Sequence, residues 1–219
     1  MKIVAIVSGG MDSGTLVHHL LDQGHVVKAL GFDYGQRHLK ELEYAAQLCE
    51  KAGVPFNAVD LTFISDFIAG KSALVNKDVA VPDGHYEDEN MKQTVVPNRN
   101  MIMLSVAIGH AVAEEFDAVA YAAHGGDHAI YPDCRPEFAN AVAQCALLCD
   151  WRQIELLRPF INMTKADIAA RGAELGVPFD LTWSCYKGRE KHCGTCGTCV
   201  ERREAFQLGS VSDPTEYES

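Results

Sequence analysis

The sequence lacks several features that would place the chain in a membrane or an export pathway. No apolar run approaches the roughly 20 residues that a membrane-spanning helix needs. The chain enters a strand-like run, residues 2–7, without a charged leader or a cleavage-site pattern. It contains no internal repeat and no low-complexity tract. We therefore expect a cytoplasmic protein that has no contact with a membrane.

Basic residues are also few. The 219 residues include 19 Lys and Arg against 30 Asp and Glu, which gives a net charge of −11. A protein that binds a nucleic-acid backbone normally needs a basic surface, so this balance argues against an RNA or DNA partner. The length suits one domain with a small appendage.

A shortage of positive charge is most informative in the stretch IVAIVSGGMDSGTL, residues 3–16, because no basic residue lies between Lys2 and His18. The stretch begins as a buried strand and continues as a helix, so the turn between them presents free backbone N–H groups to an anion. Turns that bind phosphate usually carry Lys after their glycines. A purely structural tight turn is the alternative. The candidate nucleotide-binding residues are Val7, Ser8, Gly9, Gly10, Met11, Asp12, Ser13, Gly14, Thr15, Leu16 and Val17.

Strands and helices alternate along most of the chain. This alternation predicts an α/β, Rossmann-like fold, a five-stranded parallel sheet with helices on both faces. Thr164 and Asp167 resemble a capping box for a helix that ends at Gly176. Residues 70–95 break the rhythm and predict either a lid or a disordered loop. The expected strands are 2–7, 26–32, 56–61, 117–123 and 154–159, and the expected helices follow Asp12, span 37–53, follow 96–100, span 137–150 and follow Thr164.

Four cysteines cluster near the C-terminus with the spacing C-x7-C-x2-C-x2-C: Cys185, Cys193, Cys196 and Cys199. Four thiolates at short spacing suit a tetrahedral Zn²⁺ with no open position, so its role would be structural. An iron–sulfur cluster, unligated thiols and replacement of one ligand by His192 are the alternatives. The chain is thus expected to divide into an α/β domain, 1–180, and a zinc-binding helical extension, 181–219, packed on it.

Three further strings are rich in polar side chains at the expected carboxyl edge of the sheet, where open α/β sheets bind ligands. The alternative for Arg99 is a surface position at a helix start that Asn98 caps. The alternative for Cys134 is a catalytic nucleophile, which we disfavour. The candidate site residues are Gln36 and Arg37 in DYGQRH, Arg99 and Asn100 in VPNRN, and Asp127, Tyr131, Asp133, Arg135 and Glu137 in HGGDHAIYPDCRPEF.

The string Ser8-Gly9-Gly10-Met11-Asp12-Ser13 resembles the PP-loop of the ATP pyrophosphatases. The whole set, S-G-G-x-D-S, G-Q-R-H, V-P-x-R-N, Y-P-D-C-R-x-E-F and S-C-Y…C-G-x-C-x-x-C, resembles the 7-cyano-7-deazaguanine synthase (preQ0 synthase) family within that group. The resemblance implies that ATP adenylylates 7-carboxy-7-deazaguanine, that ammonia gives the amide, and that a second ATP leads to the nitrile. It also implies a structural Zn²⁺ and a homodimer.

For the site, the resemblance implies that the loop holds the leaving pyrophosphate and that Asp12 helps to place Mg²⁺. We assign the catalytic roles to Asp12, Ser13, Arg99 and Arg135, the two arginines as ligands of phosphate or of the substrate carboxylate. Asp127 and Asp133 are the candidates to recognise the guanine-like edge, since a carboxylate accepts paired N–H donors.

Other functions stay open. His124 with its glycine pair, and Asn98, depart from the family pattern beside the expected substrate pocket. A relative that stops at the amide, or that joins the activated deazaguanine to another amine, would keep the same motifs. The remaining alternatives are another PP-loop activity such as tRNA thiolation, which predicts a basic appendage, and a zinc-ribbon binding module without ATP turnover.

Overall fold

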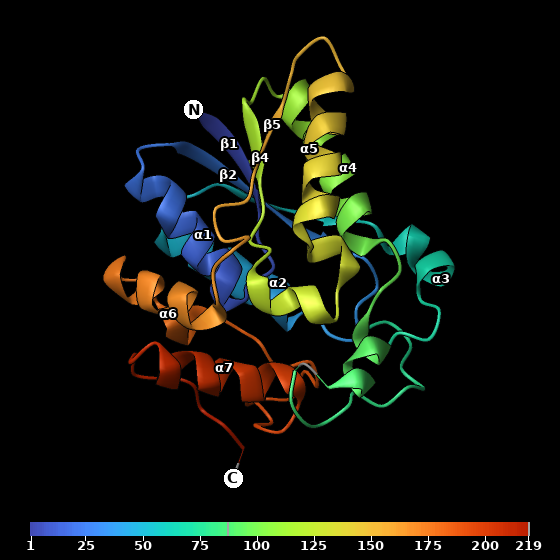
Figure 1. The fold of residues 1–219 in the computed structure, drawn as a ribbon, viewed down its shortest axis with the longest axis vertical. Helices are drawn as coiled ribbons and strands as arrows, with labels where there is room; N and C mark the ends of the chain where they lie inside the picture. The colour runs from blue at the N-terminus through green and yellow to red at the C-terminus, as the bar shows by residue number, and fades with distance from the viewer. Residues whose placement is uncertain (87, 219) are drawn as a thin grey trace.

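A central parallel sheet organises the molecule (Figure 1). The computed structural model describes residues 1–86 and 88–218. Five strands, all parallel to their neighbours, lie in the order β3-β2-β1-β4-β5. Their bounds are β1 Lys2–Ile6, β2 Val26–Asp33, β3 Phe56–Asp60, β4 Ala118–Ala120 and β5 Glu155–Leu157. The five-stranded parallel sheet expected from the sequence is confirmed.

Helices cover both faces of this sheet, as the alternation of strands and helices predicts. Alternate residues of β1 point to opposite faces. Ile3 and Ala5 pack in one buried cluster with α1 and α2, whereas Val4 packs in the other with α4 and α5. The helices are α1 Met11–Asp22, α2 Lys40–Lys51, α3 Ser65–Ile68, α4 Arg99–Ala113, α5 Pro136–Leu148, α6 Lys165–Glu174 and α7 Gly197–Leu208.

Strand order places a crevice beside β1. The chain runs outward from β1 to β2 and β3, then returns to the other side of β1 as β4. The loops that follow β1 and β4 therefore leave the carboxyl edge in opposite directions, and such a switch point is where open α/β sheets bind ligands. The turn at Ser8 follows β1 and the polar string at His124 follows β4, so both meet at this edge.

Helix α6 starts with the capping box expected from the sequence. The Thr164 hydroxyl accepts a hydrogen bond from the Asp167 N–H at 3.2 Å, and the Asp167 carboxylate accepts one from the Thr164 N–H at 2.9 Å. Two of the otherwise unpaired groups at the helix start are satisfied in this way. The start of α6 is thereby held at a defined position on the carboxyl edge.

Residues 70–95 follow a defined path in the described part of the chain, and several buried side chains anchor them, so the disordered alternative is wrong for that part. Ala73 and Val81 pack in one cluster with the four cysteines, and Met91 is fully buried in the core under α4. The Gly84 N–H donates to the Thr195 carbonyl at 3.2 Å, which ties the segment to the C-terminal region. Residue 87 lies outside the described part of the chain. The lid function stays a prediction.

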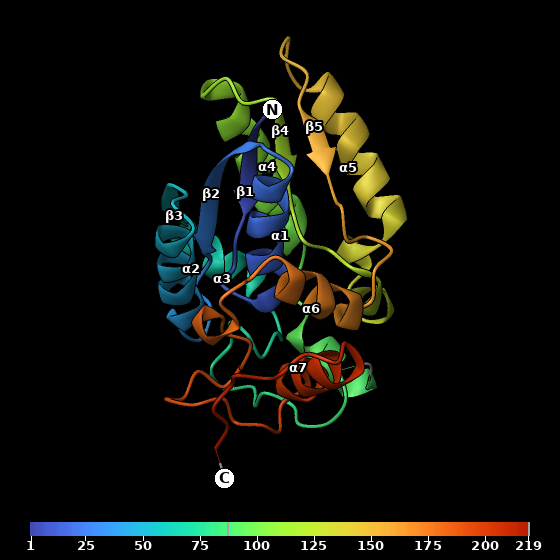
Figure 2. The same ribbon diagram turned by 90° about the vertical axis from the view of Figure 1, so that its left-hand side faces the viewer.

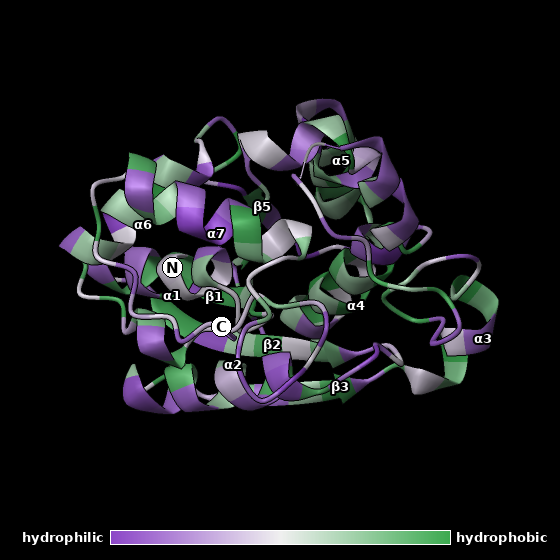
Figure 3. Cartoon of the chain, turned by 90° about the horizontal axis from the view of Figure 1, so that it is seen from below, coloured by the Kyte–Doolittle hydropathy of each residue, from purple (hydrophilic) through white to green (hydrophobic). Residues whose placement is uncertain are grey.

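The C-terminal segment lies across the carboxyl edge of the sheet, with α7 next to α6 (Figures 1 and 2). Figure 3 looks onto this end and shows hydrophilic and hydrophobic residues along both helices. Phe206 of α7 packs on Ala169 of α6, and the fully buried Arg202 donates to the Phe179 carbonyl at 2.9 Å. The boundary between residues 180 and 181 stays a prediction. In the described chain, no helix has the length and apolar character needed to cross a membrane.

Candidate active site

The turn after β1 forms a small cradle at the start of α1. The Ser8 N–H donates to the Ser13 hydroxyl at 3.2 Å, and that hydroxyl donates to the Gly10 carbonyl at 3.1 Å. Gly10 is the residue before α1, and no side chain caps the helix there. Ser8, Gly10 and Ser13 all line the same cavity. The start of α1 therefore presents N–H and hydroxyl donors to that cavity, which suits an anion.

Gly9 makes the cradle possible by close approach to α2. Its φ is +89°, and a Cβ at this position would lie 2.0 Å from the Glu41 carbonyl oxygen. The Gly9 carbonyl accepts a hydrogen bond from the Trp183 N–H at 2.8 Å. The loop is thus clamped between α2 and the C-terminal segment. Only glycine combines this φ with this contact.

A distant lysine supplies the cation that the loop lacks. Lys165, the first residue of α6, places its Nζ 3.3 Å from the Asp12 carboxylate and 2.6 Å from the Glu201 carboxylate of α7. Burial opposes the charge of Lys165, but Asp12 and Glu201 outweigh it and raise its pKa, so the side chain stays protonated. Sequence reasoning missed Lys165 and Glu201. The available signal was that Lys165 follows the last strand at the ligand-binding edge.

Asp12 has one oxygen engaged and one free. Its Oδ2 faces Lys165 and, at 3.8 Å, His124 Nε2, whereas its Oδ1 is buried with no hydrogen-bond partner in the described part of the chain. Burial raises the pKa of Asp12, but Lys165 and His124 outweigh this effect and hold the pKa below its ordinary value. An ionised carboxylate with a free oxygen beside a phosphate cradle fits Mg²⁺.

His124 stands between two carboxylates. Its Nδ1 accepts a hydrogen bond from the Gly126 N–H at 3.1 Å, so in the neutral ring the proton is on Nε2. Nε2 lies 3.5 Å from the Asp127 carboxylate and faces Asp12 on the other side. The Asp127 carboxylate also accepts a hydrogen bond from the Tyr86 hydroxyl at 3.0 Å. Asp127 is thus engaged by neighbours in the described protein.

The cavity extends from this cradle and has a volume of about 240 Å³. The sequence-predicted residues that line it come from the loop after β1, the loop after β2, the start of α4 and the loop after β4. They are Val7, Ser8, Gly10, Asp12, Ser13, Gln36, Arg37, Arg99, Asn100 and Asp127. The other predicted loop residues, Gly9, Met11, Gly14, Thr15, Leu16 and Val17, are buried and support the cradle from behind.

Two of the residues predicted to bind substrate, Gln36 and Arg37, make hydrogen bonds within the protein instead. Arg37 donates to the carbonyls of Ala73, Asn76 and Val79, and so holds the segment 73–79 beside the site. Gln36 hydrogen-bonds to the backbone of residues 32 and 34. The structure therefore gives both side chains a role in shaping the loop after β2.

The polar string after β4 lies mostly outside the cavity lining. The Tyr131 hydroxyl lies 2.6 Å from the Thr94 hydroxyl, and the Asp133 carboxylate accepts from the Asn100 N–H at 3.2 Å. Tyr131 and Asp133 do not line the cavity. Arg135 and Glu137 are exposed and also lie outside its lining, and Arg135 Nε donates to the His128 carbonyl at 2.8 Å. The catalytic role of Arg135 and the binding roles of the other three stay predictions.

Arg99 points into the cavity from the start of α4. Burial opposes its charge, but Tyr34 and Tyr186 nearby outweigh this effect and raise its pKa. The surface alternative for Arg99 is therefore wrong, and so is capping by Asn98, whose side chain makes no cap hydrogen bond and whose φ is +58°. Cys134 also lines the cavity, and burial raises the pKa of its thiol, which disfavours a nucleophilic thiolate.

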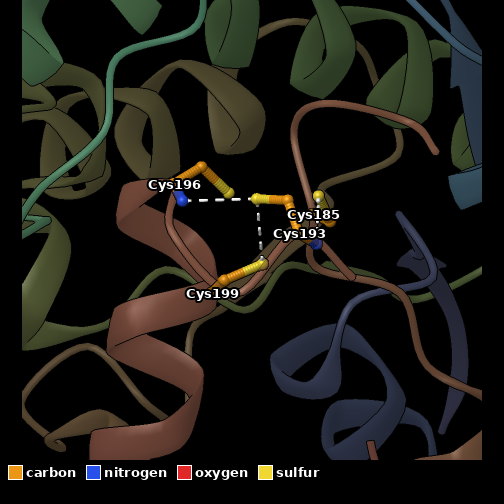
Figure 4. Close-up of side chains that lie close together, drawn as sticks. All are labelled: Cys185, Cys193, Cys196 and Cys199. Atoms are coloured by element: carbon orange, nitrogen blue, oxygen red, sulfur yellow. Dashed lines mark hydrogen bonds between the residues drawn. The ribbon is translucent and has the colours of Figure 1, made fainter. Parts of the chain in front are cut away.

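The four cysteines converge on one point at the start of α7 (Figure 4). All are buried, and their sulfur atoms lie within 4.8 Å of one another, Cys193 and Cys199 at 3.9 Å. The edge of a ZnS₄ tetrahedron is about 3.8 Å, so the four residues Cys185, Cys193, Cys196 and Cys199 fit a closed Zn²⁺ site. The N–H of Cys196 donates to the Cys193 sulfur at 3.3 Å, which stabilises a thiolate.

His192 is not needed as a ligand. Its Nε2 accepts a hydrogen bond from the Ser184 N–H at 3.1 Å, and its ring lies 4.2 Å from the Trp183 ring, centroid to centroid. Burial lowers the pKa of His192 to about 4, so the ring is a neutral acceptor at neutral pH. His192 thus positions Ser184 and Trp183, which both line the cavity.

Comparison with known proteins identifies the family. The model of the family described as queuosine biosynthesis protein QueC matches residues 2–209. The chain belongs to the QueC family. Two relatives are named 7-cyano-7-deazaguanine synthase. The one from Pseudoalteromonas translucida is 51% identical over 99% of both chains, and the one from Allorhizobium ampelinum is 54% identical over 100% of this chain and 93% of its own.

Among solved structures, the U34-tRNA thiolase NcsA from Methanococcus maripaludis, determined with its [4Fe-4S] cluster, is similar in fold. Its TM-score is 0.50 at 15% sequence identity, and the alignment covers 100% of this chain and 74% of NcsA. At this identity the likeness shows the fold alone. The QueC family chain therefore shares the α/β fold of this structure. Its full-length relatives are named as a synthase, so the chain belongs to a family of enzymes.

Proposed function

We propose that this QueC family member converts 7-carboxy-7-deazaguanine and ammonia to 7-cyano-7-deazaguanine at the expense of two ATP. The printed name of its full-length relatives supports the substrate class. The observation that carries the proposal is that the Ser8–Ser13 cradle opens into a cavity that also contains Arg99. A phosphate-binding loop and a cation for a carboxylate thus face the same space.

The proposed reaction proceeds through two activations. The substrate carboxylate oxygen attacks the α-phosphorus of ATP, pyrophosphate leaves, and ammonia displaces AMP to give the amide with loss of a proton. The amide oxygen then attacks a second ATP, and pyrophosphate leaves again. Loss of AMP and a proton from this intermediate leaves the nitrile. Atoms balance with one ammonia and two ATP consumed for two AMP and two pyrophosphate.

Each step requires stabilisation of pyrophosphate as it leaves. The start of α1 and the Ser8 and Ser13 hydroxyls would donate hydrogen bonds to it, and Lys165 would neutralise its charge. The free Oδ1 of Asp12 suits Mg²⁺, which neutralises phosphate charge when bound. We propose Zn²⁺ as the ion of the four cysteines, where it would hold the start of α7 in place.

Other parts of the proposal rest on the sequence and the family resemblance. Ammonia as the nitrogen donor, a homodimer and a cytoplasmic location stay predictions. The alternative end products, the 7-amide or a conjugate with another amine, use the same first activation.

The test is mass spectrometry of a reaction containing the purified protein, 7-carboxy-7-deazaguanine, ATP, Mg²⁺ and ammonium. We expect the nitrile mass and two AMP per nitrile formed. Detection of the amide mass, with one AMP per amide, would mean that the reaction stops at the 7-amide and that the nitrile is not the product. No AMP with this substrate would contradict the proposed function. The Asp12→Ala variant serves as the inactive control, because it removes the carboxylate of the cradle.

A further inference from the structure

One carboxyl group in the cavity has no partner. Glu41 of α2 lines the cavity, and in the described chain its carboxylate makes no hydrogen bond and no ion pair within 4.0 Å. The other two acids that line the cavity are engaged, Asp12 by Lys165 and Asp127 by the Tyr86 hydroxyl. Glu41 is half-buried at the cavity wall, so its carboxylate oxygens are free to accept hydrogen bonds from a ligand that enters the cavity.

Burial raises the pKa of Glu41 to about 7, and Arg99 opposes the shift. The Arg99 guanidinium is not within ion-pair distance of any described carboxylate, and it lies 5.9 Å from the centre of the Tyr34 ring. Tyr34 and Tyr186 complete this part of the wall. The cavity therefore offers an acceptor and a cation, separated from each other, beside two aromatic side chains.

The 7-deazaguanine ring has the complementary chemistry. Its six-membered ring presents N1–H and the 2-amino group side by side, a pair of donors that matches the two oxygens of a carboxylate. Adenine presents a single amino donor and pairs less well with a carboxylate. The 7-carboxylate is on the five-membered ring, away from the donor edge, and suits a guanidinium.

We propose that Glu41 is the residue that selects the deazaguanine, by accepting hydrogen bonds from its N1–H and 2-amino groups, with Arg99 binding the 7-carboxylate. This inference rests on the proposed function and deepens it. It replaces Asp127 and Asp133, to which sequence reasoning assigned the guanine edge, because Asp127 is engaged and Asp133 lies outside the cavity lining. Sequence reasoning passed over Glu41 because it is one acid among several on a helix.

The experiment is calorimetric titration of the full-length protein with 7-carboxy-7-deazaguanine and with its analogue that lacks the 2-amino group. For Glu41→Gln we expect about 10- to 150-fold weaker binding of the first ligand, the range for hydrogen bonds to a charged group. The preference of the unmodified protein for the 2-amino compound should largely disappear in the variant. The KM for ATP should stay unchanged. Glu43→Gln, an exposed acid on the same helix, is the matched control and should behave as the parent protein.

A pH profile adds a readout that a merely structural role would not move. Only ionised Glu41 accepts both donors, so affinity should rise with pH from 6 to 8 in the parent and stay flat in Glu41→Gln. Arg99, Tyr34 and Tyr186 face this group and keep their charge state over that window. His38 also lines the cavity, and burial lowers the pKa of its ring below the ordinary value.

Unchanged substrate affinity in Glu41→Gln, or a loss of ATP affinity instead, would overturn the inference while leaving the proposed function intact. If the parent protein itself binds neither 7-carboxy-7-deazaguanine nor the analogue, the proposed function fails first. Thermal melts establish that the Gln variant is folded. Glu41→Asp, which retains the carboxylate on a shorter side chain, should recover part of the preference for the 2-amino compound.

Discussion

The phosphate loop and its cation come from residues 153 positions apart, Asp12 and Lys165. In a loop used for γ-phosphoryl transfer, a lysine within the loop would neutralise the γ-phosphate of the nucleotide from one side. Here the cation is fixed by two carboxylates, so its position depends on α1, α6 and α7 together. Charge neutralisation at the cradle is therefore a property of the folded chain.

Replacing Lys165 with Met removes the cation and keeps most of the side-chain volume. We expect kcat/KM for AMP formation to fall by about 100-fold or more, since an electrostatic contact to the leaving group is worth several kcal/mol in a dry site. Lys191→Met is the control, because Lys191 forms an exposed ion pair with Glu216 and does not line the cavity. Equal activity of the two variants, measured by AMP release, would exclude Lys165 from the reaction.

Gly9 and Gly24 both have positive φ, yet they differ in their surroundings. A Cβ on Gly9 would lie 2.0 Å from the Glu41 carbonyl, whereas a Cβ on Gly24 meets nothing within 4 Å. We expect Gly9→Ala to destabilise the fold by more than the roughly 1 kcal/mol that positive φ costs in Gly24→Ala. Urea unfolding of both variants measures the difference. Similar losses in the two would mean that the contact with α2 can relax.

At the scale of elements, the start of α6 links local structure to the site, because the capping box fixes the helix turn that carries Lys165. Thr164→Ala should cost about 1 kcal/mol of stability and raise the KM for ATP. Thr164→Ser keeps the hydroxyl, so its stability and its KM for ATP should match those of the parent protein. Stability is measured by chemical denaturation and the KM by steady-state assays. A loss of stability without any change in the KM for ATP would mean that the cap does not determine the position of Lys165.

At the scale of the whole molecule, the cysteine cluster is connected to the cradle through α7. Cys199 and Glu201 lie in the first turns of this helix, and Glu201 holds Lys165 at 2.6 Å. The cluster also packs on residues 73 and 81, so it joins the C-terminal segment to the insertion after β3. A metal in this cluster would therefore support both sides of the cavity.

Metal removal should lower the melting temperature and abolish AMP formation together, because apo thiolates would repel one another and release α7. Elemental analysis should find one zinc per chain. Iron with visible absorbance would support the cluster alternative. Cys196→Ser should reproduce the effect of metal removal, whereas Cys145→Ser, an exposed cysteine outside the cluster, should have none. Full activity after complete metal removal would contradict the link through α7.

Much of the fold follows from patterns along the chain. Buried strands and the 3.6-residue period of α1, α2 and α4 are local consequences of covering both faces of a parallel sheet. The capping box at Thr164 and the cysteine spacing are also local, and the structure bears out both. The Ser8–Ser13 cradle is recognisable because its chemistry depends on consecutive residues.

The pocket beyond the cradle was predicted less well. Arg37, Asp133 and Arg135 are polar residues in the expected loops, yet they hydrogen-bond to the protein or lie outside the lining. Glu41 and Glu201 carry no local signal, since charged residues on helices usually face solvent. The signal for Lys165 is limited to its place after the last strand. Which of them turns inward depends on where α2, α6 and α7 pack.

Consecutive residues thus decided the secondary structure, the phosphate-binding turn and the thiolate ligands, because each depends on backbone geometry or spacing within a few residues. Only tertiary packing decided which lysine lies beside the turn, which carboxyl stays without a partner and where residues 70–95 pack. Those properties depend on distances between side chains far apart in sequence, and such distances arise only when the elements come together.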